Sequence, residues 1–278
     1  MPAPSTSQQR ALVSQFVALT GISDRQASRY LKSAGYKIDE AVDAFYSSSE
    51  ARGPSPADSQ LEKLFNSLRD AAHDDKDKME LESTMSYLDS KLKINLENAE
   101  LFIALEIVQA PNVGEIQRRG FVEGWKATGA GVSNREHAAH IQHLSSTLSK
   151  TPALFKKVYR YAFIAGREAD QKALSLENAV VYWGMLFSPP GMVWKSKNYD
   201  WLHLWKTFLN EKWTRSVNKD MWNMTLEFAL KSMADESLSF WNEDGAWPSV
   251  IDDFVSWCRI KGVGKSASTD ADDEDVIL

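Results

Sequence analysis

Residues 220 to 257 read DMWNMTLEFALKSMADESLSFWNEDGAWPSVIDDFVSW. The aromatic and aliphatic residues of this stretch recur at helical spacing on both sides of the tetrapeptide GAWP at 245–248. Gly and Pro in that tetrapeptide favour a turn, and Pro248 suits the first position of the helix that follows. The stretch therefore predicts two helices joined by a turn.

The same stretch has an uneven charge pattern. It holds eight acidic residues and a single basic residue, Lys231, interleaved with seven aromatic residues. At helical spacing most of these aromatic side chains are expected in the core. Acids on adjoining helical turns around the small Ala246 predict a shallow, negatively charged notch, which suits a protein partner rich in Lys and Arg.

The wider region 61–262 continues the helical pattern. Segments such as LEKLFNSLRDAA, AELFIALEIV and LENAVVYWGMLF repeat apolar residues at i, i+3 and i+4, and alternation with a period of two is almost absent. We therefore predict an all-α domain over residues 61–262.

Two joints in this domain have the spacing of an EF-hand loop without its ligands. Ile116 is the central apolar residue of the first loop, and Leu174 is that of the second. Calcium requires several oxygen ligands, carboxylates among them. We therefore expect EF-hand-like helix-loop-helix units that bind no metal. The residues at ligand positions one, three, five and twelve are Gln109, Pro111, Val113 and Gly120 in the first loop, and Arg167, Ala169, Gln171 and Asn178 in the second.

A small unit and two polar segments flank this domain. Residues 8–48 predict three short helices, separated at Thr20-Gly21 and at Gly35. Residues 49–60, SEARGPSPADSQ, are rich in Ser, Pro and Gly and predict a flexible linker. Residues 263–278 contain five acids and no aromatic residue, so we expect a disordered acidic tail.

Composition excludes several classes of protein. The 278 residues include 32 Lys and Arg against 38 Asp and Glu, so a nucleic-acid partner is not expected. One cysteine rules out a disulfide framework or a multi-cysteine zinc module. No stretch approaches the apolar length of a membrane span, and the first residues lack the apolar core of a signal peptide. We expect a cytosolic or nuclear protein that does not enter a membrane.

The lone Cys258 is the one candidate nucleophile. A thioester-forming enzyme needs a thiolate activated by a basic group or a helix N-terminus, and Arg259 alone does not supply that environment. His137, His140 and His143 share one face of a predicted helix. Such a face is more often a solvated surface than a metal site. We expect no catalytic residue, no cofactor and no metal.

Several motifs resemble one protein family. The runs NEDGAWPSVIDDFVSW, KDMWNMTLEF and LENAVVYWGMLF resemble the potentiating-neddylation domain of the defective-in-cullin-neddylation proteins. The N-terminal unit is similar to a ubiquitin-associated (UBA) domain, with Thr20-Gly21-Ile22 in place of the usual Met-Gly-Phe/Tyr loop and DEAVDAFY as its third helix. Together the two resemblances cover most of residues 8–262.

The resemblance implies a non-catalytic, scaffold-type ligase component. Such proteins bind the C-terminal winged-helix region of a cullin together with the neddylation conjugating enzyme, and they orient the thioester-linked modifier toward the acceptor lysine. The UBA-like unit implies binding of ubiquitin or a ubiquitin-like modifier.

The family also implies three sets of binding residues. The cullin-binding residues are Asp220, Ala246 and Asp252. A pocket for the acetylated N-terminal Met of the conjugating enzyme includes Tyr182, Met185, Leu81, Ile107, Val113 and Ile116. The ubiquitin-binding residues are Thr20, Gly21, Ile22, Phe45 and Tyr46.

Two other interpretations stay open at this stage. The protein could be a ubiquitin-binding adaptor whose acidic helical domain recognises a different basic partner. It could also be an enzyme that acts through Cys258.

Overall fold

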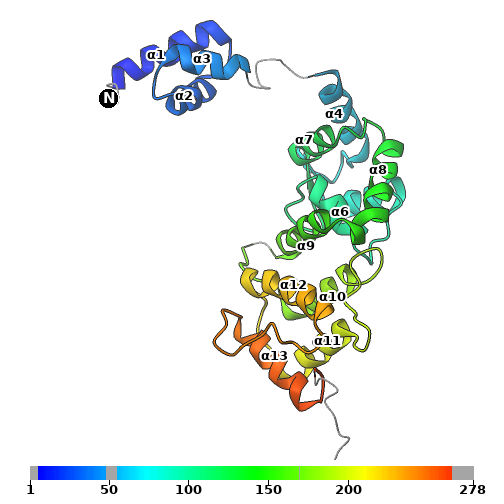
Figure 1. Ribbon diagram of the computed structural model, residues 1–278. Coiled ribbons are helices and arrows are strands. Elements are labelled where there is room, and N and C mark those ends of the chain that lie inside the picture. Colours follow the sequence, from blue (N-terminus) through cyan, green and yellow to red (C-terminus); the bar gives the residue numbers. More distant parts are fainter. Residues whose placement is uncertain (1–5, 48–54, 169, 265–278) are drawn as a thin grey trace, which may run out of the picture. The chain divides into compact units, whose positions relative to one another are not determined.

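Helices make up nearly all the regular structure of the protein, as predicted (Figure 1). The computed structural model describes residues 6–47, 55–168 and 170–264. The chain divides into two compact units, Met1–Gln60 and Leu61–Leu278. Within the described ranges, no helix is both long enough and apolar enough to cross a membrane.

The first unit is the predicted three-helix UBA-like fold. Gly21, at φ +71°, follows α1 in a conformation that favours glycine, and Ser23 caps α2 reciprocally with Gln26. Phe16 and Phe45 are the large buried side chains of this unit. Its helices are α1 (Thr6–Thr20), α2 (Asp24–Ser33) and α3 (Ile38–Ser47).

Helix α4 (Pro56–Leu68) begins inside the segment predicted as a flexible linker. The backbone N–H of Asp58 donates to Ser55 Oγ over 3.2 Å, and that of Ser55 donates to Asp58 Oδ2 over 2.7 Å. This reciprocal cap starts the helix, and Pro56 suits its first turn because the proline nitrogen has no hydrogen to satisfy. The linker prediction is therefore wrong from residue 55 onward, and residues 49–54 lie outside the described ranges.

The second unit has two halves in Figure 1, α4 with α6 to α9, and α10 to α13. Val263 is buried, so this unit extends past the predicted boundary at residue 262. The rest of the predicted acidic tail, from 265 to 278, lies outside the described residues. After α4 the elements are β1 (Lys78–Met79), α5 (Leu81–Ser86), a π-helix (Tyr87–Lys91), α6 (Glu100–Ile107), β2 (Ile116–Gln117), α7 (Arg118–Thr128), α8 (Asn134–Thr147), a 3-10 turn (Leu148–Lys150), α9 (Pro152–Gly166), α10 (Leu176–Leu186), α11 (Trp201–Lys212), α12 (Lys219–Ala234) and α13 (Ser249–Ile260).

Each predicted EF-hand-like loop pairs with a second loop through its central residue. Ile116 in β2 pairs antiparallel with Met79 in β1. Leu174 and Val217 exchange two backbone hydrogen bonds of 2.9 Å. Among the described residues, no group of three or more His, Cys, Asp or Glu is arranged to hold a metal ion.

Buried aromatic side chains join the helices of the second unit. Six of the ten tryptophans have no exposed surface. Trp222 of α12 stacks on Tyr159 of α9 at 4.7 Å and on Trp183 of α10 at 5.1 Å. The abundance of tryptophan in this chain is therefore mainly a property of its core.

His137 also belongs to the core and not to a solvated face. It has no exposed surface, and its ring stacks on Trp125 with centroids 3.8 Å apart and 3° between the planes. Its Nε2 lies 3.2 Å from the carbonyl oxygen of Gly131, and its Nδ1 lies 3.4 Å from the Tyr87 hydroxyl. A neutral ring that donates from Nε2 satisfies both contacts, and burial lowers the pKa of His137 to about 4.

We expect His137 to make the second unit less stable in acid. The unfolded chain takes up a proton at the ordinary pKa of 6.5, whereas the folded chain takes it up only at about 4. The free energy of unfolding should fall by about 3 kcal/mol across that window because of this group. Denaturant unfolding at about pH 7 and about pH 4.5 measures the loss.

The variant His137→Gln should show a smaller loss of stability between the two pH values than the wild type. His143→Gln changes an exposed residue of the same helix and serves as the control. An equal pH dependence in wild type and His137→Gln would contradict the assignment.

Candidate docking sites

The turn before α13 is held in place by Trp241. Its Nε1 donates a 2.9 Å hydrogen bond to Asp252 Oδ1, and the Arg259 guanidinium lies 4.6 Å from its ring centroid. Both partners lie on α13, so Trp241 fastens the preceding loop to that helix. Asp252 is half-buried in the first helical turn, where the helix dipole favours a carboxylate.

Ala246 is exposed in the same turn. The neighbouring Trp247 packs inward against Phe228 at 5.9 Å and Phe240 at 6.0 Å. Pro248 was predicted at the first helical position but occupies the N-cap, and the helix begins one residue later at Ser249. A small residue therefore stands on the surface of a loop whose large side chains are turned toward the core.

Asp220 lies on α12, outside this turn and outside α13. It is exposed in the first turn of α12, after the N-cap Asn218. Helix α12 meets the turn at Phe228, which is eight residues further on, or about 12 Å along the helix axis. A partner that touches Asp220, Ala246 and Asp252 must therefore span α12 and α13.

Some acids of this region are used within the fold. Asp235 accepts hydrogen bonds from the side chains and backbone of Ser237 and Ser239, which lower its pKa to about 2. Glu227 pairs with Lys156 at 2.7 Å, and Glu236 accepts from Asn198. The exposed acids are Asp220, Glu243, Asp244 and Asp253.

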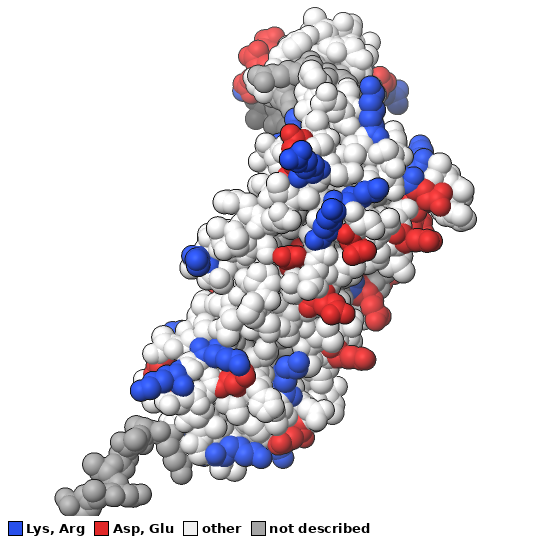
Figure 2. All heavy atoms as spheres, turned by 90° about the vertical axis from the view of Figure 1, so that its right-hand side faces the viewer, with Lys and Arg blue, Asp and Glu red and all other residues white. Residues whose placement is uncertain are grey.

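One face of the molecule carries charges of both signs. On the face shown in Figure 2, Lys and Arg side chains lie among Asp and Glu side chains. Neither sign forms an unbroken field on that face.

The six predicted pocket residues differ widely in exposure. Ile116 has no exposed surface and Met185 is 8% exposed, so a ligand reaches them only if their neighbours move. Leu81 is 62% exposed, and its Cδ1 would lie 3.0 Å from a Cβ added to Gly114. The structure thus places Leu81 over the loop that contains Val113, which is half-buried.

Tyr182 and Ile107 belong to different surroundings. The half-buried Tyr182 ring meets Phe102 edge-on at 5.0 Å and crowds Gly166, and burial raises its pKa. Ile107, at the end of α6, lines a cavity of about 380 Å³ between α6, α7 and α9.

The predicted ubiquitin-binding residues separate into a core part and a surface part. Phe45 is 3% exposed, so its assignment to a binding surface is wrong in this structure. It packs among Phe16, Tyr30 and Tyr46. Thr20 and Ile22 are half-buried, and the Thr20 hydroxyl donates to the carbonyl of Phe16.

The surface of the first unit also includes Leu19, near the end of α1. Leu19 is 54% exposed and Tyr46 is 55% exposed. The Tyr46 hydroxyl donates a 2.9 Å hydrogen bond to the Leu19 carbonyl, so the two residues are neighbours. The signal available in the sequence was that Leu19 borders the Thr20-Gly21-Ile22 loop. The role of Trp241 as an anchor is not predictable from the sequence, because its bond to Asp252 crosses the turn and leaves no local pattern.

Cys258 is not part of a surface site. It is fully buried in α13, and burial raises the pKa of its thiol to about 12. A thiol with this pKa is almost entirely protonated near neutral pH. The structure therefore gives no support to a catalytic thiolate at this position.

The fold defines a two-unit helical protein. Residues 136–257 match the family model described as cullin binding, and residues 10–52 match the model of a UBA-like domain. The chain belongs to the defective-in-cullin-neddylation protein family.

Similar proteins cover nearly the whole chain. Identity to the Defective in cullin neddylation protein 1 of Pyricularia oryzae is 43%, over 97% of this chain and 99% of that protein. The protein of the same name in Cryptococcus neoformans is 31% identical over 92% and 96%. Human DCN1-like protein 4 is 30% identical over 59% of this chain and 52% of its own length.

Proposed function

We propose that this protein is a scaffold for cullin neddylation, which binds a cullin and the conjugating enzyme at the same time. The observation that carries the proposal is the match of residues 136–257 to the cullin-binding model, because this segment contains Asp220, Ala246 and Asp252. A relative that covers 97% of the chain is also named for cullin neddylation. The exposed acids around the turn suit a basic winged-helix partner.

The proposed mechanism uses no catalytic group from this chain. Holding two reactants in the correct geometry can lower a barrier by about 7 to 11 kcal/mol without an acid, base or nucleophile. The buried Cys258 supports this proposal, since it is the only thiol. The scaffold orients the modifier toward the acceptor lysine, whose amine attacks the thioester carbonyl, so that an amide bond forms and the thiol of the conjugating enzyme leaves.

The double variant Ala246→Arg with Asp252→Lys should weaken binding of a cullin C-terminal fragment by about 100-fold or more. It fills the small-residue position and reverses the charge, and losing one partner of a close interfacial charge pair costs about 2 to 5 kcal/mol. Calorimetry with the purified fragment measures the change.

The control for this double variant is Glu97→Lys. It reverses the charge of an exposed acid in the connection before α6 and should keep wild-type affinity. Unchanged affinity in the double variant would reject the site. Failure of the wild type to bind any cullin fragment would favour the adaptor with a different basic partner.

We propose that the exposed Leu81 and the half-buried Val113, in the corner that also contains the buried Ile116, receive the acetylated N-terminus of the conjugating enzyme. Acetylation removes the charge of the terminal amine, and burying an uncompensated ammonium costs far more than burying an amide. The 62% exposure of Leu81 supports an apolar contact at this corner.

A peptide with the N-terminal sequence of the conjugating enzyme should bind about 10-fold or more tightly when it is acetylated than when its amine is free. Fluorescence polarisation with the two labelled peptides measures the ratio. Equal affinities for the two forms would remove the argument for an apolar pocket.

We propose a third docking surface for ubiquitin or a ubiquitin-like modifier on the UBA-like unit. Leu19, Gly21 and Tyr46 are exposed there, and Ile22 is half-buried beside them. An exposed apolar group of this kind suits the apolar face of such a modifier.

Tyr46→Ala should weaken ubiquitin binding about 5-fold to 10-fold while the first unit stays folded, because an exposed aromatic contact is lost. Phe45→Ala should instead unfold this unit, since removing a buried phenyl ring costs about 3 to 5 kcal/mol. Amide NMR spectra of the full chain with and without ubiquitin separate the two effects. Wild-type affinity in folded Tyr46→Ala would exclude Tyr46 from the surface.

A further inference from the structure

Arg118 connects three segments that are distant in the sequence. It is the first residue of α7, directly after β2, and its side chain is 19% exposed. Its Nη1 donates to Glu62 Oε2 over 2.6 Å, and its Nη2 donates to Asn66 Oδ1 over 2.8 Å, both on α4. Its Nε donates to Asp77 Oδ1 over 3.1 Å, on the loop before β1.

Two further contacts complete the surroundings of this side chain. Nη2 also donates to the backbone carbonyl of Lys76, and the guanidinium carbon lies 4.6 Å from the ring centroid of the fully buried Phe65. All three guanidinium nitrogens are thus engaged, and one face of the group is covered by an aromatic ring. A planar fork of donors suits such a site, whereas a Lys ammonium offers one point of charge.

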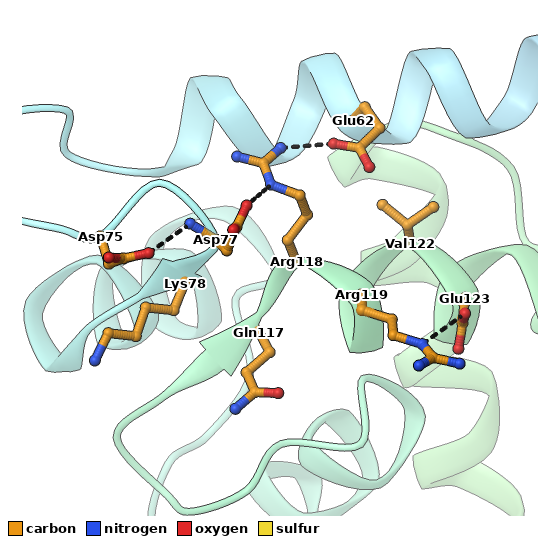
Figure 3. A pocket seen from close by; sticks show the side chains of 9 residues that line it. All are labelled: Glu62, Asp75, Asp77, Lys78, Gln117, Arg118, Arg119, Val122 and Glu123. Atoms are coloured by element: carbon orange, nitrogen blue, oxygen red, sulfur yellow. Dashed lines mark hydrogen bonds and ion pairs between the residues drawn. The ribbon is translucent and has the colours of Figure 1, made fainter. Parts of the chain in front are cut away.

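Figure 3 shows this side chain reaching from the β2–α7 junction to α4. A hollow of about 500 Å³ lies between α4, the strands and α7, with Val122 among its lining residues. Arg119 points away from α4 toward Glu123, on its own helix. Of the two adjacent arginines, only Arg118 bridges to α4.

The bonds of Arg118 hold the loop that leads into the corner with the exposed Leu81. Asp77 and Lys76 stand directly before β1, whose Met79 pairs with Ile116. Leu81 follows two residues later and covers Gly114 of the facing loop. Single exposed ion pairs contribute little stability, and Glu62 and Asp77 are 42% and 60% exposed. The consequence of this network is therefore mainly geometric.

We propose that Arg118 is the positioning residue of the β1–β2 corner, meaning Met79, Leu81, Val113, Gly114 and Ile116. By tying α4 to the loop before β1, it keeps this corner in the form that binds an apolar ligand group. The functional part of this inference rests on the proposed pocket for an acetylated terminus. Its structural part rests on the bonds of Arg118 alone.

The deciding variant is Arg118→Met in the full chain, which keeps an apolar stem over Phe65 and removes every guanidinium bond. Amide hydrogen exchange at residues 78–79 and 116–117 should become about 10-fold faster or more. Binding of the acetylated peptide should weaken about 5-fold to 10-fold, while affinity for the cullin fragment stays at the wild-type value. Arg118→Lys should give intermediate values.

Arg119→Met is the matched control, because Arg119 is 84% exposed and bonds within its own helix. It should leave both measurements unchanged. If Arg118→Met does not fold, Arg118→Lys decides, and its intermediate exchange rate is the supporting result. Wild-type exchange and wild-type peptide affinity in the folded Arg118 variants would overturn the proposal. If the wild type itself binds no acetylated peptide, the pocket fails, and hydrogen exchange alone decides the positioning role.

Discussion

Reciprocal hydrogen bonds between Tyr159 and Trp222 join helices α9 and α12 in the core of the second unit. The Tyr159 hydroxyl donates to the Trp222 carbonyl over 2.8 Å, and Trp222 Nε1 donates to the Tyr159 carbonyl over 2.9 Å. Trp183 Nε1 donates to the same hydroxyl over 2.8 Å. These polar groups are buried, so each would carry a desolvation cost if it lacked its partner. The bonds therefore set one relative position for α9, α10 and α12.

The acidic surface depends on this buried arrangement. Helix α12 carries Asp220 in its first turn, Trp222 in the core and Phe228 against the turn before α13. A displacement of α12 at Trp222 would therefore move Asp220 relative to Ala246. The same helix belongs to the core along one side and to a candidate docking surface along another, which explains why aromatic and acidic residues are interleaved in its sequence.

The other half of the unit depends on close backbone contacts and on one side chain. Gly120 and Gly124 of α7 face the carbonyl oxygens of Val108 and Ile107, and a Cβ at either glycine would overlap them. Helix α7 can therefore approach the end of α6 closely. Arg118 then joins α7 to α4 and to the loop before β1 through its side-chain hydrogen bonds.

Local sequence patterns by themselves determined the all-helical fold class, the three-helix first unit and the central positions of Ile116 and Leu174, because spacing and turn residues act over a few positions. Tertiary contacts alone make Met79 and Val217 their partners, bury Phe45 while the adjacent Tyr46 is exposed, and tie α4 to Arg118. Neighbouring helical residues point about 100° apart, so a small rotation of a helix exchanges core and surface. Partners that lie far apart in the sequence, such as Met79 and Ile116 or Glu62 and Arg118, leave no local pattern, since their contact exists only after the chain has closed the loop between them.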